Sequence, residues 1–458
     1  MTAVHAPTWS GPVDLPLLGE PDVQAACGLM HVHGRHLGRP APLGMDYARA
    51  VAAELSAIGE FAVELGRTRG VPLAGCTTSV AQAALLSISQ YLAAATADEP
   101  DEWLPGAGPP FRSSDGAVFE VEALDPGPWS RFWAALDVPA RAVERGWRPF
   151  LHRFATATCP LPNDFADAAA RTPFSALETT ARQAGMTVVV RSGRVLDSLP
   201  AYRISPRGPD WSTSAEVAPD GELPLSGIVV LESCRRVQGP LVGHLLGLLG
   251  ATVVRIEPPG GDPLRWVPPM AGDTSARFLA LNRGKSVVEI DLRTGRDEVL
   301  DLAAAADVFV HNWAPGKAVR WGLRAEDFPS GLVYAHASGW GDELGPEPPL
   351  GTDFVVQAHA GVPASLMTVV DVFGGVVATH AVVDALLRRE RSGRGQSVAS
   401  SLLSAASRLN ALTRHHDTSA PTVPVCTDLA ALARDPRFAR ALIRDRCALP
   451  ASPWEFFR

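Results

Sequence analysis

The sequence is poor in lysine, because only Lys285 and Lys317 contribute to its 41 basic residues and all the others are arginines. Acidic residues outnumber basic ones, so the formal net charge is −8 and the pI is near 5.9. A surface of this charge repels nucleic acid and anionic membranes. We therefore expect no nucleic-acid partner, and an anionic ligand would need a local cationic pocket. The presence of Lys285 in such a sequence has two equally good explanations. It is a chance survivor of a codon usage that favours arginine, or its side chain binds phosphate.

Closely spaced cysteine pairs and a signal peptide are also lacking. None of the six cysteines forms a C-x-x-C motif, which argues against a zinc site or a disulfide framework and favours free thiols in a reducing compartment. The first residues lack the basic and apolar regions of a secretory signal. We therefore expect a cytoplasmic protein without a metal site.

No apolar run is free of charged residues over the length of a membrane span. The longest apolar tract, 361–387, contains Asp371, His380 and Asp384. It predicts a buried helix, so we expect no membrane partner. At 458 residues the chain is long enough for two or more domains.

A nucleotide-binding pattern is present, but it lacks the dinucleotide fingerprint. A β-branched strand over 227–232, a turn at 237–240, an apolar helix over 241–249 and a second strand over 251–257 form a βαβ pattern. The first turn is expected at the carboxyl edge of a parallel sheet, where α/β proteins hold ligands. That turn has Gln238-Gly-Pro240 in place of Gly-x-Gly-x-x-Gly. NAD is therefore not the expected ligand.

These residues resemble a known family. The order Leu225-Ser-Gly227, Gln238-Gly-Pro240, Leu249-Gly-Ala-Thr-Val-Val-Arg-Ile-Glu257 and Gly260-Gly-Asp-Pro263 is similar to that of the family III CoA-transferases. This CaiB/BaiF family includes formyl-CoA and carnitine CoA-transferases and the α-methylacyl-CoA racemases. Further matches follow in the same order: Leu281-Asn-Arg-Gly-Lys-Ser286, Ile290-Asp-Leu292, Ala306-Asp-Val-Phe-Val-His-Asn-Trp313, Arg320-Trp-Gly-Leu323, Leu332-Val-Tyr334, Gly339-Trp-Gly341 and Asp353 with Gln357-Ala358. The resemblance implies an α/β fold, with a Rossmann-like parallel sheet and a smaller α+β domain.

The order of the parts departs from the usual order in the family. We expect a first aspartate and helical segment, a small α+β domain, a linker, a Rossmann-like CoA-binding segment, a second aspartate and helical segment, and a C-terminal segment. Their expected ranges are 1–96, 97–204, 205–222, 223–345, 346–415 and 416–458.

The two aspartate segments resemble each other. Each has a Gln-Ala pair, then an aspartate (Asp46 or Asp371), then a long helix, and each ends in a second helix, over 78–87 or 397–406. We interpret the chain as two incomplete repeats. The resemblance implies a homodimer, interlocked as in the family, and the repeats could imitate part of that interlocking within one chain.

Asp371, in Val-Val-Asp-Val-Phe-Gly-Gly, matches the family's catalytic aspartate. CoA transfer needs a group that carries first an acyl group and then a thioester, and a partly desolvated carboxylate can do both. Helix N–H groups could stabilise the oxyanion, and the glycines would let the backbone approach. The alternative for Asp371 is a helix N-cap. Asp46 takes the equivalent place in the first repeat, where a helix cap is the preferred interpretation.

Asp353 matches an assisting carboxylate of the family's transferases. The family's racemases have a histidine just before it, used as one of two bases, and Thr352 stands there instead. The interval between Asp353 and Asp371 is shorter than in the family, which leaves the geometry of the site open.

The resemblance also suggests contacts with CoA, which we expect as a substrate together with acyl-CoA; no cofactor is expected to be bound permanently. Gln238 is expected near the thioester and Asn312 and Arg320 near the nucleotide. Lys285 is a candidate for phosphate. Arg265 could replace the cation that the family often has where Pro258 stands.

The predicted function is that of an acyl-CoA:carboxylate CoA-transferase, a transferase of sulfur-containing groups, acting through a covalent aspartyl intermediate. Its partners would be acyl-CoA and a carboxylic acid. Two alternatives stay open: an acyl-CoA racemase, isomerase or dehydratase of the same fold, and a catalytically degenerate subunit that binds CoA or interlocks with an active relative.

Overall fold

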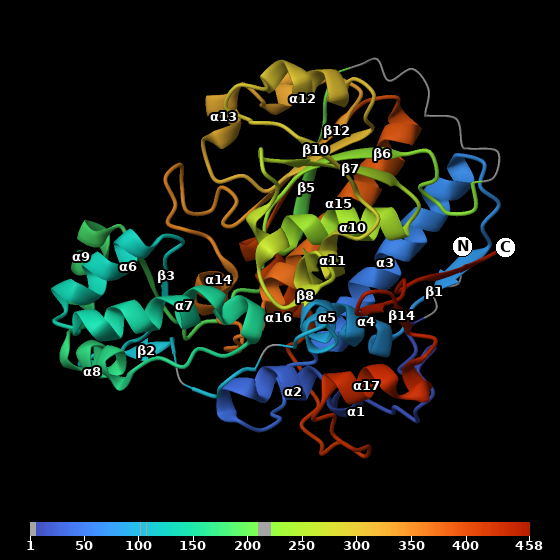
Figure 1. Cartoon of the computed structure of the whole chain (residues 1–458). Coiled ribbons are helices and arrows are strands. Elements are labelled where there is room, and N and C mark those ends of the chain that lie inside the picture. Colours follow the sequence, from blue (N-terminus) through green and yellow to red (C-terminus); the bar gives the residue numbers. More distant parts are fainter. Residues whose placement is uncertain (1–5, 101, 107, 209–220) are drawn as a thin grey trace.

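The protein is built around a seven-stranded sheet, in a computed structural model that describes residues 6–100, 102–106, 108–208 and 221–458 (Figure 1). The strand order is β10-β7-β6-β11-β12-β13-β5. The strands are β5 (Tyr202–Pro206), β6 (Val229–Ser233), β7 (Thr252–Glu257), β10 (Ser286–Glu289), β11 (Val308–His311), β12 (Val333–Ser338) and β13 (Gln396–Ser401). All pairs are parallel except that of β5 with β13.

The six parallel strands have the order of a dinucleotide-binding fold. The chain enters at β6, moves outward through β7 and β10, and returns to start again at β11 on the other side of β6. Parallel sheets of this kind bind ligands at the carboxyl ends of the strands where the order reverses, here between β6 and β11. The predicted Rossmann-like α/β fold is therefore confirmed. Helix α10 (Gln238–Leu248) follows β6 and begins three residues before its predicted start, because Pro240 is compatible with the first turn of a helix.

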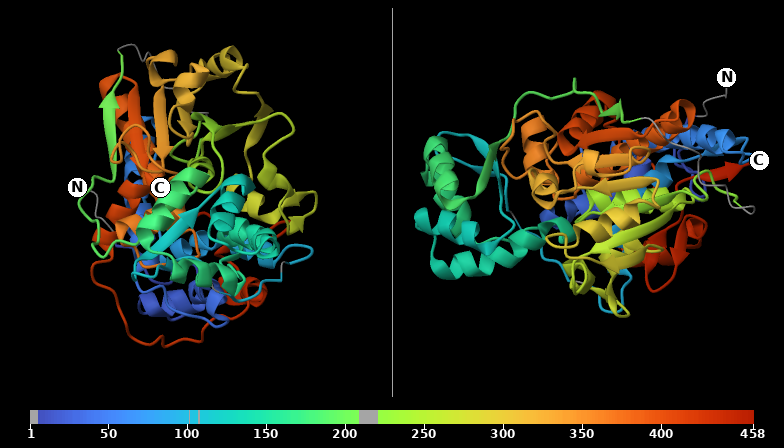
Figure 2. Two further views of the ribbon diagram at one scale, coloured as in Figure 1. Left: turned by 90° about the vertical axis from the view of Figure 1, so that its left-hand side faces the viewer. Right: turned by 90° about the horizontal axis from the view of Figure 1, so that it is seen from above.

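Side chains of the central strands alternate between two apolar cores. In β11, Val308 and Val310 enter the main core, whereas Phe309 enters a second core on the opposite face. Helices α10 and α15 (Val369–Ser392) pack together on the first face, and α12 (Arg296–Ala303) covers the other (Figure 2). Burial on both faces explains why these strands are so apolar in sequence.

A smaller α+β unit projects to one side of the sheet (left in Figure 1). It combines the antiparallel sheet β2-β3-β4 with four helices, and its core includes Trp129 stacked on Phe150 at 4.4 Å between ring centroids. Strands β3 and β4 contact α14 (Asp353–Ala360), so the small unit reaches the second aspartate segment. Its elements are β2 (Phe111–Arg112), β3 (Val118–Glu122), β4 (Thr187–Val190), α6 (Pro126–Ala135), α7 (Ala140–Thr156), α8 (Asn163–Arg171) and α9 (Phe174–Ala184).

Strand β5 corrects one expected boundary. Residues 202–206 form the edge strand of the large sheet, across the expected end of the small domain at residue 204. Most of the expected linker, residues 209–220, lies outside the described residues.

Further short elements surround the sheet and the small unit. They are α2 (Leu29–His33), α5 (Ser89–Ala95), β8 (Met270–Ala271), β9 (Thr274–Ser275), α11 (Ala276–Asn282), α13 (Lys317–Trp321), α17 (Leu429–Arg434), β14 (Leu442–Arg444), β15 (Ala448–Pro450), β16 (Glu455–Phe457) and short 3-10 helices at Gly34–Leu37, Pro263–Trp266, Ala325–Asp327 and Pro436–Phe438.

The two resembling segments form a structural repeat. The first consists of α1 (Glu20–Ala26), α3 (Tyr47–Thr68), β1 (Gly75–Thr77) and α4 (Val80–Ser87). The second consists of α14, α15, β13 and α16 (Leu402–Leu412). Helices α3 and α15 pack against each other through the centre of the protein (Figure 1). The predicted helix over 397–406 is wrong in its first half, because residues 397–401 pair with β12 as part of β13.

Hydrogen bonds show which residues of the repeats correspond. In the first repeat, the Gln24 amide donates to the Met45 carbonyl at 2.8 Å. In the second, the Gln357 amide donates to the Met367 carbonyl at 3.3 Å. Met45 and Met367 therefore occupy equivalent places just before α3 and α15.

The helix starts confirm this register and correct the place of Asp46. Asp46 precedes α3 with φ −77° and ψ 63°, and Thr368 precedes α15 with φ −78° and ψ 59°. Counting from these caps, Arg49 corresponds to Asp371, and Asp46 does not. Asp46 does stand at the N-cap position, although its side chain makes no capping bond.

Helix α15 includes most of the long apolar tract. It is long and apolar enough to cross a membrane, but 89% of its most apolar window is buried inside the protein. Because α3, α10 and α16 pack around it, the prediction of a buried core helix is confirmed.

Candidate functional site

A cavity of about 390 Å³ lies where the small unit, the β6–α10 loop and the starts of α14 and α15 meet. The loop follows the carboxyl end of β6, which is the edge at which the fold predicts a ligand. The polar residues that line the cavity are Glu122, Arg153, Arg236, Thr352, Asp353, Thr368 and Asp371.

Asp371 lies in the first turn of α15, at the third helical position. Thr368 is the N-cap, so the simple capping interpretation of Asp371 is wrong. Burial raises the pKa of the Asp371 carboxyl to about 7, the Arg236 charge opposes this rise, and the Glu122 charge adds to it. A carboxyl with a pKa near neutrality exchanges its proton readily under physiological conditions.

Asp353 is the first residue of α14 and is buried. Its Oδ2 accepts a hydrogen bond from the Asp371 backbone N–H at 2.6 Å, and its Oδ1 accepts one from the Gln357 amide. Burial and the adjacent Asp371 raise the pKa of the Asp353 carboxyl well above its usual range, while those two donors oppose the rise. The carboxylate thus anchors the backbone of Asp371.

The shortened connection between the two aspartates still brings them together. The Ser365 N–H donates to the Gln357 Oε1 at 3.0 Å, and the Gln357 amide donates to the carbonyls of Ser365 and Met367. One buried glutamine therefore fixes the path of the short loop. The shorter loop therefore still places Asp353 next to the backbone of Asp371.

Glu122, Arg153 and Arg236 were not found by sequence reasoning. Glu122 ends β3 and Arg153 belongs to α7, where its Nη2 lies 3.2 Å from the Glu122 Oε2. The Thr352 hydroxyl donates to the same carboxylate. Glu122 and Arg153 both belong to the small unit, and the docking of that unit on α14 brings Thr352 to them.

Arg236 presents a cation beside Asp371 from an uncommon backbone conformation. Its φ is +68°, in the left-handed region, which for a residue other than glycine costs on the order of 1 kcal/mol. Asn312 fixes the preceding residue: its Oδ1 accepts from the Arg235 N–H at 2.9 Å and its Nδ2 donates to the Arg235 carbonyl at 2.8 Å. Asn312 therefore acts as a clamp on this loop, and its contact with the nucleotide stays a prediction.

Gln238, the first residue of α10, lies against the helix that carries Asp371. Its side chain is buried, and its Nε2 has no hydrogen-bond partner among the described residues. A Cβ at Gly374 would lie 3.2 Å from that Nε2, and a Cβ at Gly375 would lie 2.8 Å from the Gln238 carbonyl oxygen. The glycine pair therefore allows the close approach of α10 and α15 and places an unused amide donor one turn from Asp371.

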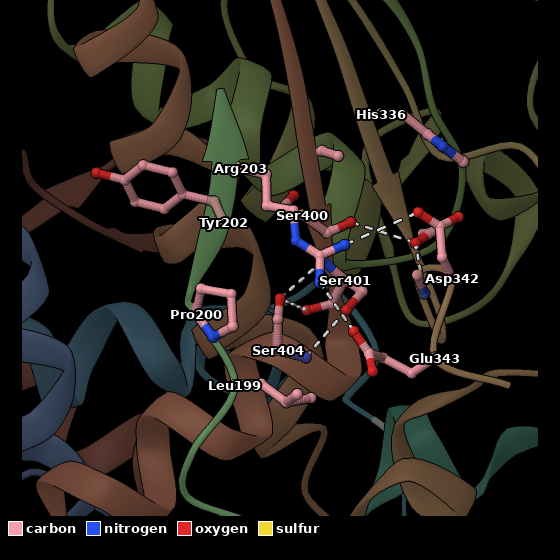
Figure 3. Close-up of a pocket in the computed structure, with 13 residues that line it drawn as sticks. Leu199, Pro200, Tyr202, Arg203, His336, Asp342, Glu343, Ser400, Ser401 and Ser404 are labelled. Carbon is pink, nitrogen blue, oxygen red and sulfur yellow. Dashed lines mark hydrogen bonds and ion pairs between the residues drawn. The ribbon is translucent and has the colours of Figure 1, made fainter. Parts of the chain in front are cut away.

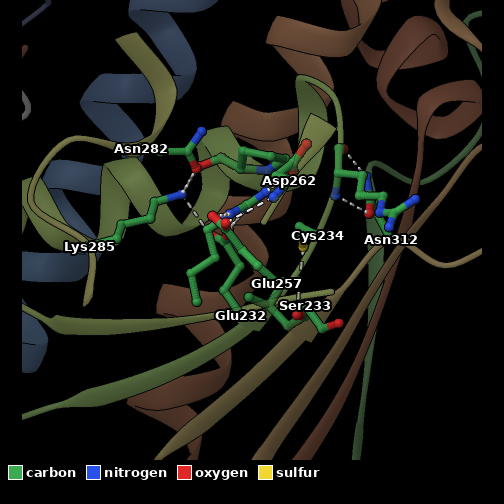
Figure 4. Close-up of polar contacts among 12 residues, drawn as sticks. Glu232, Ser233, Cys234, Glu257, Asp262, Asn282, Lys285 and Asn312 are labelled. Atoms are coloured by element: carbon green, nitrogen blue, oxygen red, sulfur yellow. Dashed lines mark hydrogen bonds and ion pairs between the residues drawn. The ribbon is translucent and has the colours of Figure 1, made fainter. Parts of the chain in front are cut away.

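Lys285 is not placed to bind phosphate, which corrects that expectation. Its Nζ lies 2.7 Å from the Glu232 Oε2 and donates to the Pro240 carbonyl at 2.7 Å and to the Asn282 Oδ1 at 2.9 Å (Figure 4). Its three N–H groups are thus used in the interior. Glu232 also pairs with Arg255, which continues the network to Glu257 and Asp262.

The two remaining predicted cations do not line the Asp371 cavity. Arg265 forms two contacts with Glu257, at 2.7 and 2.8 Å, and lies over the Phe278 ring at 4.2 Å from its centroid. Arg320 is exposed on α13. Of the predicted residues, the structure brings Asp353 and Asp371 together in the cavity and places Gln238 against Gly374, one turn from Asp371. It leaves Arg265, Lys285, Asn312 and Arg320 outside the cavity.

A second cavity, of about 530 Å³, lies between β5, β12 and β13 (Figure 3). Arg203, Ser400 and Ser404 line it, and Arg203 pairs with Glu343 at 3.1 Å and with Asp342 at 3.9 Å. Neither Asp353 nor Asp371 lines this cavity. Its two carboxylates, those of Asp342 and Glu343, are paired with Arg203 and open to solvent, whereas Asp353 in the first cavity is buried.

Comparison with known proteins gives the same family as the sequence motifs. Residues 225–433 match the model of CoA-transferase family III. The succinyl-CoA:glutarate CoA-transferase of Mus musculus is 33% identical over 214 residues, which cover 42% of this chain and 49% of that relative. A probable fatty acyl-CoA transferase of Mycobacterium tuberculosis is 37% identical over 195 residues, 37% of this chain and 48% of its own.

Among solved structures, a CaiB/BaiF family protein from Brucella suis is 34% identical and covers 42% of this chain and 56% of its own, with a TM-score of 0.39. The chain spans about half the length of the curated relatives it matches. Residues 225–433 are therefore similar to CoA-transferase family III, over slightly less than half of the chain.

Proposed function

We propose that this protein transfers CoA from an acyl-CoA to a carboxylic acid and that Asp371 is its covalent nucleophile. The observation that carries the proposal is the juxtaposition of Asp371, Asp353, Arg236 and Gln238 at the carboxyl edge of a CoA-transferase segment. Relatives whose names describe CoA transfer to carboxylic acids support the reaction class. Because the chain matches only about half of each of them, the activity of the whole protein is a proposal.

The reaction would proceed in balanced steps. The Asp371 carboxylate attacks the thioester carbonyl, the carbon–sulfur bond breaks, and a mixed anhydride and CoA thiolate form. The thiolate then attacks the Asp371 carbonyl and releases the first acid, leaving an aspartyl-CoA thioester. The acceptor carboxylate attacks this thioester, which releases the CoA thiolate and forms a second anhydride between Asp371 and the acceptor. The thiolate then attacks the acceptor's carbonyl, which gives the new acyl-CoA and frees the Asp371 carboxylate. Each step forms one acyl bond and breaks another, so no net proton is consumed.

The neighbours of Asp371 fit distinct roles in these steps. Asp353 holds the backbone of the nucleophile through its 2.6 Å bond to the Asp371 N–H. The unpartnered Gln238 amide can donate to an oxyanion that forms at the carbonyl under attack. Arg236 favours the ionised form of Asp371, which is the nucleophilic form, and can attract the acceptor carboxylate.

Racemase chemistry is the less well supported alternative. A two-base mechanism needs a second base beside Asp353, and Thr352 stands there with its hydroxyl donated to Glu122. The nearest histidine in sequence, His359, packs its ring edge-on against Trp340, with 5.3 Å between centroids. Transfer therefore fits these side chains better than proton exchange.

The raised pKa of Asp371 leads to a pH prediction. Because only the ionised carboxylate attacks, kcat/KM for acyl-CoA should rise with pH and level off above about pH 7, the pKa to which burial raises this group. The Arg236 charge lowers the pKa of Asp371, so Arg236→Gln should move the rising limb to higher pH. Initial rates measured between about pH 5 and about pH 9 test both statements. A rate independent of pH across this range would contradict the assignment.

An exchange assay tests the reaction class. The protein is incubated with an unlabelled acyl-CoA and with the corresponding free carboxylic acid in labelled form. We expect the label to appear in the acyl-CoA. In deuterated water, the α-carbon of the acyl group should gain no deuterium, whereas a racemase would introduce it. CoA binding without either exchange would instead support a catalytically degenerate subunit.

A further inference from the structure

The two repeats touch each other at equivalent positions, close to Asp371. Tyr47 is the first residue of α3 and Val369 is the first residue of α15, so the register that pairs Arg49 with Asp371 also pairs these two. The Tyr47 hydroxyl donates a hydrogen bond to the Val369 carbonyl at 2.9 Å. Contact between equivalent residues is typical of a two-fold interface. The first repeat therefore reaches the chain two residues before the proposed nucleophile.

The contact made by Tyr47 lies in the interior of the protein. The Tyr47 side chain is fully buried, and Val369 is buried as well. Burial, together with the charge of Asp353, raises the pKa of the Tyr47 hydroxyl well above its usual range. The hydroxyl therefore keeps its proton, and its hydrogen bond to the start of α15 is maintained throughout the neutral range of pH.

A second contact from the first repeat reaches the short loop before α15. His33 ends α2, which lies between α1 and α3, and its Nδ1 lies 2.9 Å from the Ser365 Oγ. Burial, aided by the neighbouring His36, lowers the pKa of His33 to about 4, so the ring is neutral. The Ser365 Oγ also accepts from the Met367 N–H at 3.1 Å, while Gln357 binds the backbone of Ser365. Both repeats thus hold the same residue of the loop.

These contacts restrain the segment that leads to Asp371. The bond from the Asp371 N–H to Asp353 is formed within the second repeat. The two contacts from the first repeat act earlier in the chain, at Ser365 and Val369, where the loop turns into α15. A displacement of a reacting group by about 1 Å can lower a rate about a hundredfold. A segment fixed from two sides therefore favours a constant placement of the Asp371 carboxyl.

We propose that Tyr47 and His33 are positioning residues, which hold the start of α15 in the geometry at which Asp371 reacts. The inference rests on the proposed CoA transfer and gives a role to the repeat that has Arg49 at the equivalent of the reacting position. Neither Tyr47 nor His33 is among the described residues that line the Asp371 cavity. Both therefore act through the backbone and the loop, without contact with the substrate.

Tyr47→Phe tests the first contact, because it removes the donor and keeps the ring. We expect kcat to fall at least about tenfold and KM for acyl-CoA to change less than about twofold. Tyr334→Phe is the matched control. Tyr334 is also buried, and its hydroxyl donates to the Leu323 carbonyl at 2.8 Å in the second core. Both variants should lose a similar, small part of their stability in urea, but Tyr334→Phe should keep the kcat of the wild type.

The pH profile distinguishes positioning from a general loss of stability. Burial raises the pKa of Asp371 to about 7, so a looser helix start that admits water should lower this pKa. The rising limb of kcat/KM should therefore move to lower pH in Tyr47→Phe and stay in place in Tyr334→Phe. Neither variant alters the charged groups that line the cavity with Asp371, which are Asp353 of α14, Glu122 of β3, Arg153 of α7 and Arg236 of the β6–α10 loop.

Two substitutions of His33 test the second contact. Asparagine can place a polar atom near the position of the imidazole Nδ1, whereas leucine has none. His33→Asn should keep kcat within about twofold of the wild type, and His33→Leu should lower it about fivefold. Equal kcat values for these two variants would overturn the role of His33.

The outcomes separate this inference from the proposed function. Equal kcat values and equal pH limbs for Tyr47→Phe and Tyr334→Phe overturn the inference, even where the wild type transfers CoA through Asp371. A wild type that transfers no CoA overturns the proposed function instead. Labelling of protonated carboxyls with a carbodiimide and glycinamide, followed by peptide mapping, then still reports the titration of Asp371. A titration shifted only in Tyr47→Phe supports the inference, and identical titrations in the two variants overturn it.

Discussion

Asp371→Asn is expected to lower the rate of CoA transfer by about four orders of magnitude or more, as the loss of a covalent nucleophile commonly does. Asparagine keeps the size of the side chain and the backbone N–H that Asp353 accepts from, so the fold and the loop should be retained. The amide cannot form the anhydride, however, so both later intermediates are lost. Steady-state rates with a saturating acyl-CoA and acid measure the effect.

The internal repeat supplies a matched control for this variant. Arg49 occupies in α3 the position that Asp371 occupies in α15, and its side chain is 65% exposed. The Arg49 guanidinium lies 3.6 Å from the Asp46 carboxylate and does not line the Asp371 cavity. Arg49→Ala should therefore retain transfer within about twofold of the wild type, because a pair with one largely exposed partner contributes little. Transfer by Asp371→Asn at a rate close to that of the wild type would exclude the covalent mechanism.

Gly243→Ala is expected to destabilise the fold by about 3 kcal/mol or more. A Cβ at this position of α10 would lie 1.9 Å from the Glu232 Oε2 and 3.3 Å from the Lys285 Nζ. Glu232 is fully buried and pairs with both Lys285 and Arg255, so it cannot move without breaking a buried ion pair (Figure 4). Urea unfolding followed by circular dichroism measures the loss.

Gly247→Ala, one turn later on the same helix, is the control for this substitution. The nearest atom to a Cβ there is the Val253 Cγ2 at 3.7 Å, which is an ordinary contact. Alanine is the better helix former, so this variant should be as stable as the wild type or more stable by up to about 1 kcal/mol. Similar stabilities for the two variants would contradict the account of the buried network.

The sheet was predictable because its signals are local. Apolar β-branched runs over 227–232 and 251–257, with a helix between them, correspond to β6, α10 and β7 within a few residues. The strand β13 was mistaken for helix because a short run of serine, valine and alanine has no decisive period. Only pairing with β12 and β5 determines its state.

The site was predictable only in part. Asp353, Asp371 and Gln238 lie within family motifs, whereas Glu122, Arg153 and Arg236 meet them through tertiary packing. Its rarity makes Lys285 a candidate for phosphate binding, with codon usage an equally good explanation, but burial beside Glu232 decides its partners. The repeats were aligned on their aspartates, and the glutamine–methionine bonds show that the true register places Arg49 opposite Asp371.

Mass spectrometry of the covalent adduct tests the central claim most directly. After incubation with acyl-CoA and quenching with hydroxylamine, peptide mapping should find one modified aspartate, Asp371, converted to its hydroxamate. The adduct should be absent from Asp371→Asn and present in Arg49→Ala. A modification confined to another carboxylate, or no adduct in a protein that catalyses transfer, would contradict the mechanism.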